Sequence, residues 1–164
     1  MEAKGDLILM SEPDGSFEAK DLYKFLMYSN EFDVVFGTRT SKSLIWSGAK
    51  MDWFLRIGNV AVAKLLEYVH NGPCLTDVGC TMKMIKKDAY LKIKNDFKVG
   101  ENYFSPDFMI SCMKNNLEIV EIPVNYKERI GESKITSSFW KSFKLGMKMI
   151  WHIIKRKVER KNEN

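Results

Sequence analysis

Two acidic residues that could bind a metal ion, Glu12 and Asp14, follow the short apolar run Leu7-Ile-Leu-Met10. They belong to the segment Ser-Glu-Pro-Asp-Gly, whose proline and glycine mark a turn, so both carboxylates can face one cation. Mg²⁺ and Mn²⁺ prefer carboxylate oxygens and keep positions open for substrate phosphates. Asp and Gly are also ordinary turn residues. Taken alone, the pair therefore favours a plain turn over a metal site.

Two further acids and several basic residues are candidates for contacts with a sugar or a phosphate. Asp77 lies in Thr-Asp-Val-Gly-Cys-Thr, where its carboxylate can contact a sugar hydroxyl or cap a turn. Asp107 follows Ser-Pro at an expected helix start, where an acid also favours the helix dipole. Arginine binds phosphate through two parallel hydrogen bonds, although a single arginine is more often a surface residue. The basic candidates are Arg39, Arg56, Arg129 and Lys134.

The elements expected to position these residues begin with a strand, a helix and a second strand. Residues 7–10 form an apolar run, residues 17–28 carry apolar positions at helical spacing, and residues 32–36 form another apolar run that a glycine ends. This succession within about thirty residues is typical of a βαβ unit in a parallel sheet.

The rest of the chain alternates helices and strands. Residues 51–70 predict a long helix, residues 80–85 a strand, residues 106–115 a helix and residues 118–124 a strand. The apolar positions at helical spacing on the long helix include Phe54, Ile57, Ala61 and Leu65. The pattern predicts an α/β fold without a glycine-rich phosphate loop before the first strand.

The basic charge is concentrated at the C-terminal end. The net charge is +5, but nine Lys/Arg and two Glu from residue 134 onward contribute +7, which leaves −2 for the first 133 residues. On a helix over residues 136–158, the apolar and basic side chains fall on different sides. The expected apolar face consists of Phe139, Phe143, Met147, Ile150 and Ile154, with Trp140 and Trp151 at its border and Lys141, Lys144, Lys148 and Lys155 opposite. This pattern predicts a helix on an anionic membrane surface. The alternative is a helix packed on the domain with a solvated lysine face.

Composition narrows the class of protein. With 164 residues, 45% of them hydrophobic, the chain predicts one folded domain. No apolar run reaches the roughly eighteen residues of a transmembrane helix, so none is expected. Three cysteines without metal-ligand spacing indicate reduced thiols and a cytoplasmic protein. Together with the basic amphipathic helix, this predicts a peripheral protein at the cytoplasmic face of a membrane. No nucleic-acid-binding motif accompanies the basic end, so nucleic acid is not an expected partner.

A series of motifs in one order resembles a known family. The series is Asp14-Gly-Ser, Val35-Phe-Gly-Thr-Arg39, Arg56-Ile-Gly-Asn59, Leu75-Thr-Asp-Val-Gly-Cys-Thr81, Tyr103-Phe-Ser-Pro-Asp107, Glu121-Ile-Pro-Val-Asn-Tyr126 and Arg129-Ile-Gly-Glu-Ser-Lys134. It resembles family 2 glycosyltransferases, close to the dolichyl- or polyprenyl-phosphate mannosyl- and glucosyltransferases, over roughly residues 5–150.

The resemblance implies a partial GT-A domain, a Rossmann-like α/β nucleotide-sugar-binding fold, over residues 1–134. The residue pattern described above adds a basic amphipathic membrane-surface helix and tail over residues 135–164. It implies inverting transfer of a hexose from a nucleotide sugar of the GDP-mannose or UDP-glucose class to a lipid phosphate. The implied ligands of Mg²⁺ or Mn²⁺ are Glu12, Asp14 and Ser16. The implied catalytic residues are Asp77, Asp107 and Arg129, and the implied substrate-binding residues are Arg39, Arg56, Arg129, Ser133 and Lys134.

The chain departs from the family pattern in three places. Glu12 stands where the family has the first Asp of Asp-x-Asp, and Asp107 stands where a Glu is usual. The family's N-terminal Pro-x-Tyr-Asn-Glu segment and acidic nucleoside-binding strand have no counterpart in the sequence. We therefore expect an uncovered sheet edge that favours a complementing subunit or a homo-oligomer. The alternative to an enzyme is a non-catalytic relic or a membrane-peripheral interaction subunit.

Overall fold

The computed structural model describes residues 4–49, 53–100, 103–130 and 139–163. In these ranges the strands are β1 (Leu7–Met10), β2 (Val34–Thr38), β3 (Lys83–Lys86) and β4 (Ile119–Pro123), and the helices are α1 (Leu22–Tyr28), α2 (Trp53–His70), α3 (Lys87–Ile93), α4 (Phe104–Lys114) and α5 (Phe139–Glu163). Short 3-10 turns at Ala19–Asp21 and Lys42–Leu44 precede α1 and follow β2. The predicted α/β fold is confirmed. α3 was not predicted, because its seven residues follow β3 with no turn residue between them.

The strands of the described ranges form one mixed sheet in the order β1-β3-β2-β4. β2 and β4 are parallel, whereas β3 runs antiparallel to both β1 and β2. The predicted parallel βαβ unit was therefore wrong in its pairing, because β3 lies between β1 and β2. Met84 and Ile85 of β3 are buried on opposite faces of the sheet, so this strand needs a central position with both faces covered. Leu9 of β1 is 41% exposed, which suits an edge strand.

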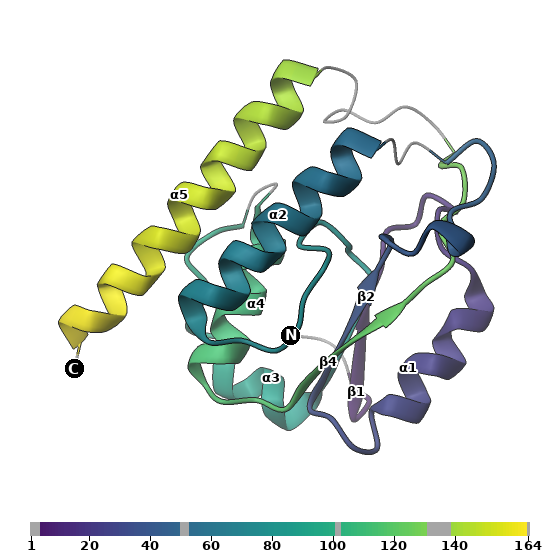
Figure 1. Cartoon of the computed structure of the whole chain (residues 1–164). Helices are drawn as coiled ribbons and strands as arrows, with labels where there is room; N and C mark the ends of the chain where they lie inside the picture. Colours follow the sequence, from purple (N-terminus) through teal and green to yellow (C-terminus); the bar gives the residue numbers. More distant parts are fainter. Residues whose placement is uncertain (1–3, 50–52, 101–102, 131–138, 164) are drawn as a thin grey trace.

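Helices cover both faces of the sheet (Figure 1). α1 packs on one face, where Phe25 belongs to the same apolar cluster as Val35 and Met84. α2, α3, α4 and α5 cover the opposite face, whose core includes Val34 and Phe36. β2 is buried along its whole length because it is a central strand between these two helical layers.

The buried face of α2 is not the one marked by the apolar spacing of Phe54, Ile57, Ala61 and Leu65. Val62 and Leu66 are buried, whereas Ile57 is 55% exposed. α2 packs against both α4 and α5, so its inward direction is set by neighbouring helices and not by the sheet alone. His70 Nε2 near its end lies 3.1 Å from the carbonyl oxygen of Ile153 in α5.

α5 is attached to the domain by a buried polar network as well as by apolar contacts. Asp107 of α4 is fully buried, and its Oδ1 lies 2.7 Å from His152 Nε2 and 3.2 Å from Arg156 Nε. The backbone N–H of Lys98 donates to Asp107 Oδ2 at 2.7 Å. Arg156 also donates from Nη2 to the carbonyl oxygen of Asp96 at 3.0 Å. Two polar residues of α5 are therefore part of its packed side.

The side of α5 that faces away from the domain is apolar. Its members, here called the α5 stripe, are between 48% and 72% exposed and comprise Trp140, Met147, Trp151, Ile154 and Val158. Lys155 Nζ lies 5.1 Å from the centre of the Trp151 ring, and further exposed lysines lie beside the stripe. One side of the helix thus packs on the domain while an apolar side flanked by lysines stays exposed. Within the described ranges, no helix combines the length and the apolarity that crossing a bilayer requires.

Candidate functional site

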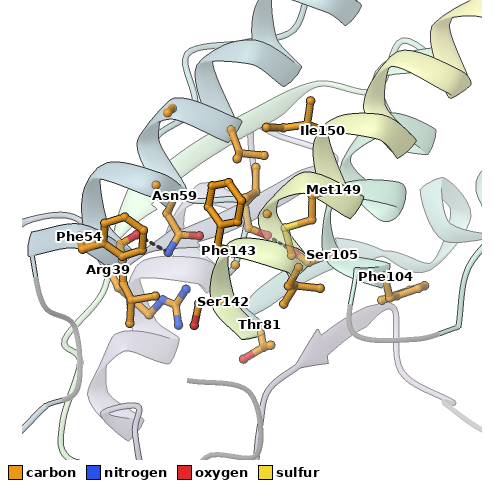
Figure 2. Close-up of a pocket in the computed structure, with 18 of the residues that line it drawn as sticks. Arg39, Phe54, Asn59, Thr81, Phe104, Ser105, Ser142, Phe143, Met149 and Ile150 are labelled. Atoms are coloured by element: carbon orange, nitrogen blue, oxygen red, sulfur yellow. Dashed lines mark hydrogen bonds between the residues drawn. The ribbon is translucent and has the colours of Figure 1, made fainter. Parts of the chain in front are cut away.

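A cavity of about 790 Å³ lies between α2, α5 and the segments that flank the strands. The helices provide its apolar wall, to which Phe54 of α2 and Phe143 and Met149 of α5 contribute (Figure 2). The segments at the sheet provide its charged wall. The charged residues described there are Glu12, Arg39, Lys83 and Arg129. The cavity therefore has two chemically different walls.

The acidic turn after β1 folds around the carboxylate of Asp14. The backbone N–H and the hydroxyl of Ser16 donate to Asp14 Oδ1 at 3.0 and 2.6 Å. Gly15 has a φ of +73°, a conformation that glycine adopts without steric cost. Arg129 pairs with both acids of the turn: its Nε lies 2.6 Å from Asp14 Oδ2, and its Nη2 donates to Glu12 Oε2. The predicted metal ligands thus lie together, and one predicted substrate-binding arginine joins them.

The pKa values of the two carboxyl groups in this turn move in opposite directions. Burial and the hydrogen bond with Asp14 raise the pKa of Glu12 above its usual value. Burial alone would raise the pKa of Asp14, but hydrogen bonds from Ser16 and contacts with Glu12 and Arg129 outweigh it and lower that pKa. Asp14 therefore keeps its negative charge to lower pH than Glu12 does.

The oxygen donors of the acidic turn suit a hard divalent cation. Two carboxylates and a hydroxyl leave coordination positions for the phosphate oxygens of a ligand. In the described part of the chain, no group of three or more His, Cys, Asp or Glu is placed to hold a metal. The guanidinium of Arg129 pairs with both carboxylates, so a cation would compete with it. The turn would fit a cation whose coordination a phosphate ligand completes.

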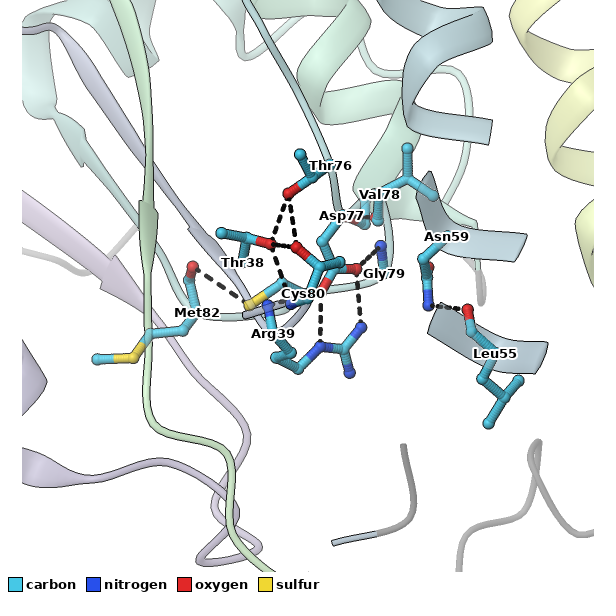
Figure 3. A network of polar contacts seen from close by, with 12 residues as sticks. Thr38, Arg39, Leu55, Asn59, Thr76, Asp77, Val78, Gly79, Cys80 and Met82 are labelled. Atoms are coloured by element: carbon cyan, nitrogen blue, oxygen red, sulfur yellow. Dashed lines mark hydrogen bonds and ion pairs between the residues drawn. The ribbon is translucent and has the colours of Figure 1, made fainter. Parts of the chain in front are cut away.

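Asp77 is fully buried and holds Arg39 in place (Figure 3). Asp77 Oδ2 accepts from the backbone N–H and the Nε of Arg39 at 3.0 and 2.9 Å, and Oδ1 accepts from Nη2 at 3.0 Å. Burial alone would raise the pKa of Asp77, but the charge and hydrogen bonds of Arg39 lower it. A Cβ on Gly79 would lie 2.9 Å from Arg39 Nη2 and 2.8 Å from Asn59 Oδ1, so glycine permits this close approach. Asp77 thereby fixes Arg39 at the cavity wall.

The remaining predicted site residues lie elsewhere. Asp107 belongs to the buried network that attaches α5, and it is not among the described residues of the cavity wall. Arg56 borders a separate hollow of about 380 Å³ together with Thr40. Ser133 and Lys134 lie outside the described residues.

Two polar residues of the cavity wall, Lys83 and Asn59, were given no role from the sequence. Lys83 is only 3% exposed although it is a lysine. Residues two apart in a strand share a face, so its position two before the apolar Ile85 was a signal that it points inward. Asn59 ends the motif Arg56-Ile-Gly-Asn59, but only Arg56 of that motif was expected to bind substrate.

Comparison with known proteins relates the chain to hexosyltransferases. No family model matches it. It is 29% identical over 132 residues to a protein of Haloferax volcanii named "Dolichyl-phosphate hexose transferase". The matched region covers 79% of this chain and 54% of that protein. It is 26% identical over 136 residues to "Low-salt glycan biosynthesis hexosyltransferase Agl6" of the same organism, with coverages of 82% and 32%. An uncharacterized protein of Methanocaldococcus jannaschii is 24% identical over 163 residues, with coverages of 94% and 62%.

The chain therefore spans less than two thirds of the length of each of these relatives. The two Haloferax names support the expected glycosyltransferase class, at low sequence identity.

Proposed function

We propose that this chain is the acceptor-side part of a family 2 hexosyltransferase, which transfers a hexose from a nucleotide sugar to a polyprenyl or dolichyl phosphate. The names of two relatives, a dolichyl-phosphate hexose transferase and a hexosyltransferase, support this reaction class. A sheet with helices on both faces is compatible with a partial GT-A domain. The nucleotide sugar, the lipid phosphate and any complementing subunit are part of the proposal.

The observation that carries the proposal is the division of the cavity into a charged wall and an apolar wall. A lipid phosphate has the same two parts. Its phosphate would meet Arg39 and Arg129, and its hydrocarbon chain would lie between α2 and α5. Arginine binds phosphate through paired hydrogen bonds, and buried hydrocarbon contributes about 25 cal/mol per Å².

Two helix glycines leave room at the apolar wall. Gly58 of α2 and Gly146 of α5 both line the cavity, and a Cβ added at either would meet no atom within 4 Å. Alanine would stabilise a helix by about 1 kcal/mol relative to glycine. Packing therefore does not require glycine at these positions, whereas a ligand between the helices would benefit from the open space.

Gly58→Leu and Gly146→Leu are each expected to weaken the binding of farnesyl phosphate without unfolding the protein. A leucine that takes the ligand's space should reduce the binding free energy by about 1–3 kcal/mol, roughly ten- to a hundredfold in affinity. Isothermal titration calorimetry measures this. Gly100→Leu is the matched control, because Gly100 also has open space around it but lies outside the described cavity wall. Unchanged affinity in both cavity variants would contradict the assignment.

In the proposed reaction, a lipid phosphate oxygen attacks the anomeric carbon opposite the leaving nucleoside diphosphate, so the configuration inverts. The attacking oxygen is already anionic, and the main demand is stabilisation of charge. Arg39, positioned by Asp77, would orient the acceptor phosphate. Mg²⁺ or Mn²⁺ held by Glu12, Asp14 and Ser16 would offset the charge of the leaving diphosphate.

The metal proposal predicts opposite changes in Mn²⁺ affinity for two variants. Asp14→Asn removes a carboxylate ligand and should weaken binding, whereas Arg129→Met removes the competing guanidinium and should strengthen it. Each change is expected to be about tenfold, as is typical when groups around a metal site are altered. Electron paramagnetic resonance of free Mn²⁺, with and without a nucleoside diphosphate, measures both. Asp88→Asn, at an exposed position of α3, serves as the control. Wild-type affinity in both variants would argue against a metal at this turn.

The α5 stripe supports attachment to the cytoplasmic face of a membrane. Its exposed apolar side chains would enter the headgroup region, and the flanking lysines would attract anionic lipid. The cavity, which α5 partly lines, would then open beside an acceptor that resides in the bilayer.

A further inference from the structure

Lys83 is a buried lysine in the cavity wall, at the first position of β3. In the sheet it lies opposite Met10, which comes two residues before Glu12, and opposite Phe36. Its ammonium lies 5.5 Å from the centre of the Phe36 ring and donates a hydrogen bond to the carbonyl oxygen of Cys80. The strand pairing thus places a buried cation beside the strand that leads into the acidic turn.

The charge of Lys83 has no carboxylate counter-ion in the described part of the chain. The acids that act on it from a distance are already engaged: Asp77 pairs with Arg39, and Glu121 accepts hydrogen bonds from the backbone of Thr76 and Asp77. Burial lowers the pKa of Lys83, and the neighbouring acids offset this effect only in part. An ammonium has three donors, and the carbonyl oxygen of Cys80 accepts from one of them.

The other cations in the described cavity wall are neutralised by the protein itself. Arg39 pairs with Asp77, and Arg129 pairs with Glu12 and Asp14. A buried cation without a counter-ion destabilises a fold, and an apolar residue of similar length would avoid that loss. The position of Lys83 is therefore better suited to binding an anion than to packing.

We propose that Lys83 is a phosphate-binding residue whose ammonium donates to a phosphate oxygen of the ligand in the cavity. The identity of that ligand rests on the proposed function. Either the phosphate of the lipid acceptor or the diphosphate of the nucleotide sugar supplies the same chemistry, and both are anions that an ammonium in a low-dielectric wall attracts strongly.

The test compares phosphate-bearing probes with their phosphate-free counterparts in the wild-type chain and in Lys83→Met. Farnesyl phosphate is compared with farnesol, and UDP and GDP with uridine and guanosine. The preference for the phosphate-bearing probe should fall about tenfold or more in Lys83→Met, because a charge-assisted hydrogen bond is removed. The affinity for the phosphate-free probes should not change. The pair that responds identifies whether the lipid or the nucleotide supplies the phosphate.

Lys86→Met is the matched control, because Lys86 ends the same strand but pairs with Asp33 at 3.7 Å and lies outside the described cavity wall. It should leave every preference unchanged. Lys83→Met should also raise the melting temperature, because a desolvated charge is removed, whereas a lysine with a purely structural role would lower it when replaced.

The inference is overturned if Lys83→Met keeps the wild-type preference for phosphate in every pair, or if the wild-type chain shows no such preference. Failure of the proposed function gives a different result. In that case the wild-type chain binds neither farnesyl probe, or Gly58→Leu and Gly146→Leu leave farnesyl phosphate binding unchanged. A loss of nucleotide preference in Lys83→Met would still support Lys83 as a phosphate ligand.

Discussion

Asp107→Ala is expected to destabilise the protein by about 3–5 kcal/mol, the loss typical when one partner of a buried ion pair is removed. Arg156 is 1% exposed and, among the described acids, would keep Glu159, at 4.0 Å, as its ion-pair partner. His152 would lose the carboxylate that now lies 2.7 Å from its Nε2. Urea denaturation followed by circular dichroism measures the change in the free energy of unfolding.

A double variant tests whether the uncompensated charge causes this loss. Asp107→Ala combined with Arg156→Met removes both charges and should be more stable than Asp107→Ala alone. Asp88→Ala is the control, because Asp88 is an exposed acid in the first turn of α3 and should contribute at most about 1 kcal/mol. If Asp107→Ala costs no more than Asp88→Ala, the network does not attach α5.

The same network should make stability sensitive to acid. Burial alone would raise the pKa of Asp107, but hydrogen bonds from His152 and the Lys98 backbone, together with the charge of Arg156, hold it below its usual value. The unfolded pKa is about 3.9, so the contribution is fully present above that pH and is lost as the pH falls through the lower folded value. The stability of the wild-type protein should therefore fall more steeply below about pH 4 than that of Asp107→Ala.

Replacing Trp151, Ile154 and Val158 by serine should weaken binding to anionic vesicles about a hundredfold, because roughly 25 cal/mol per Å² of apolar burial is lost over three side chains. All three belong to the exposed α5 stripe and lie outside the described cavity wall. Each lysine near an anionic surface adds about 1 kcal/mol, so binding should rise with anionic lipid and fall with salt. Liposome sedimentation measures these dependences.

A control for general surface hydrophobicity is available on α1. Tyr23 and Met27 are 73% and 70% exposed, and α1 covers the other face of the sheet. Tyr23→Ser with Met27→Ser should leave vesicle binding unchanged. If the wild-type chain does not bind anionic vesicles at low salt, the α5 stripe is not a membrane-binding surface.

The strands and long helices could be predicted because each is encoded by a local pattern, but their arrangement could not. The alternation in β3 shows which residues point to opposite faces, yet nothing local indicates that Met84 and Ile85 lie between β1 and β2. The inward face of α2 could not be read from its apolar spacing for the same reason, because α4 and α5 help to define it. For α5, the sequence pattern did not distinguish the polar side that packs through His152 and Arg156 from a solvated side.

In the candidate site, too, residues close together in the sequence could be predicted, whereas contacts between distant residues could not. Glu12 and Asp14 were found because they are two residues apart, whereas the contact of Arg129 with Glu12 spans 117 residues and was not predicted. The catalytic role of Asp107 was expected from the family resemblance, whereas its contact with His152, 45 residues away, has no signal in the sequence. Lys83 was overlooked because an isolated lysine in a short strand is usually solvated.

Within the described ranges, β1 pairs with β3 alone. In this pairing Met10 lies opposite Lys83, which comes more than seventy residues later in the chain. Closing so long a loop is slower than forming helices, because the chain entropy is lost before the contacts form. At about 5–20 residues per second, the ribosome needs seconds to synthesise the intervening segment. During that time β1, which leads into the acidic turn, lacks its pairing with β3. The two carboxylates of the turn therefore reach Arg129 and the cavity only late in folding. The proposed binding of cation and phosphate should then be among the last properties that the nascent protein acquires.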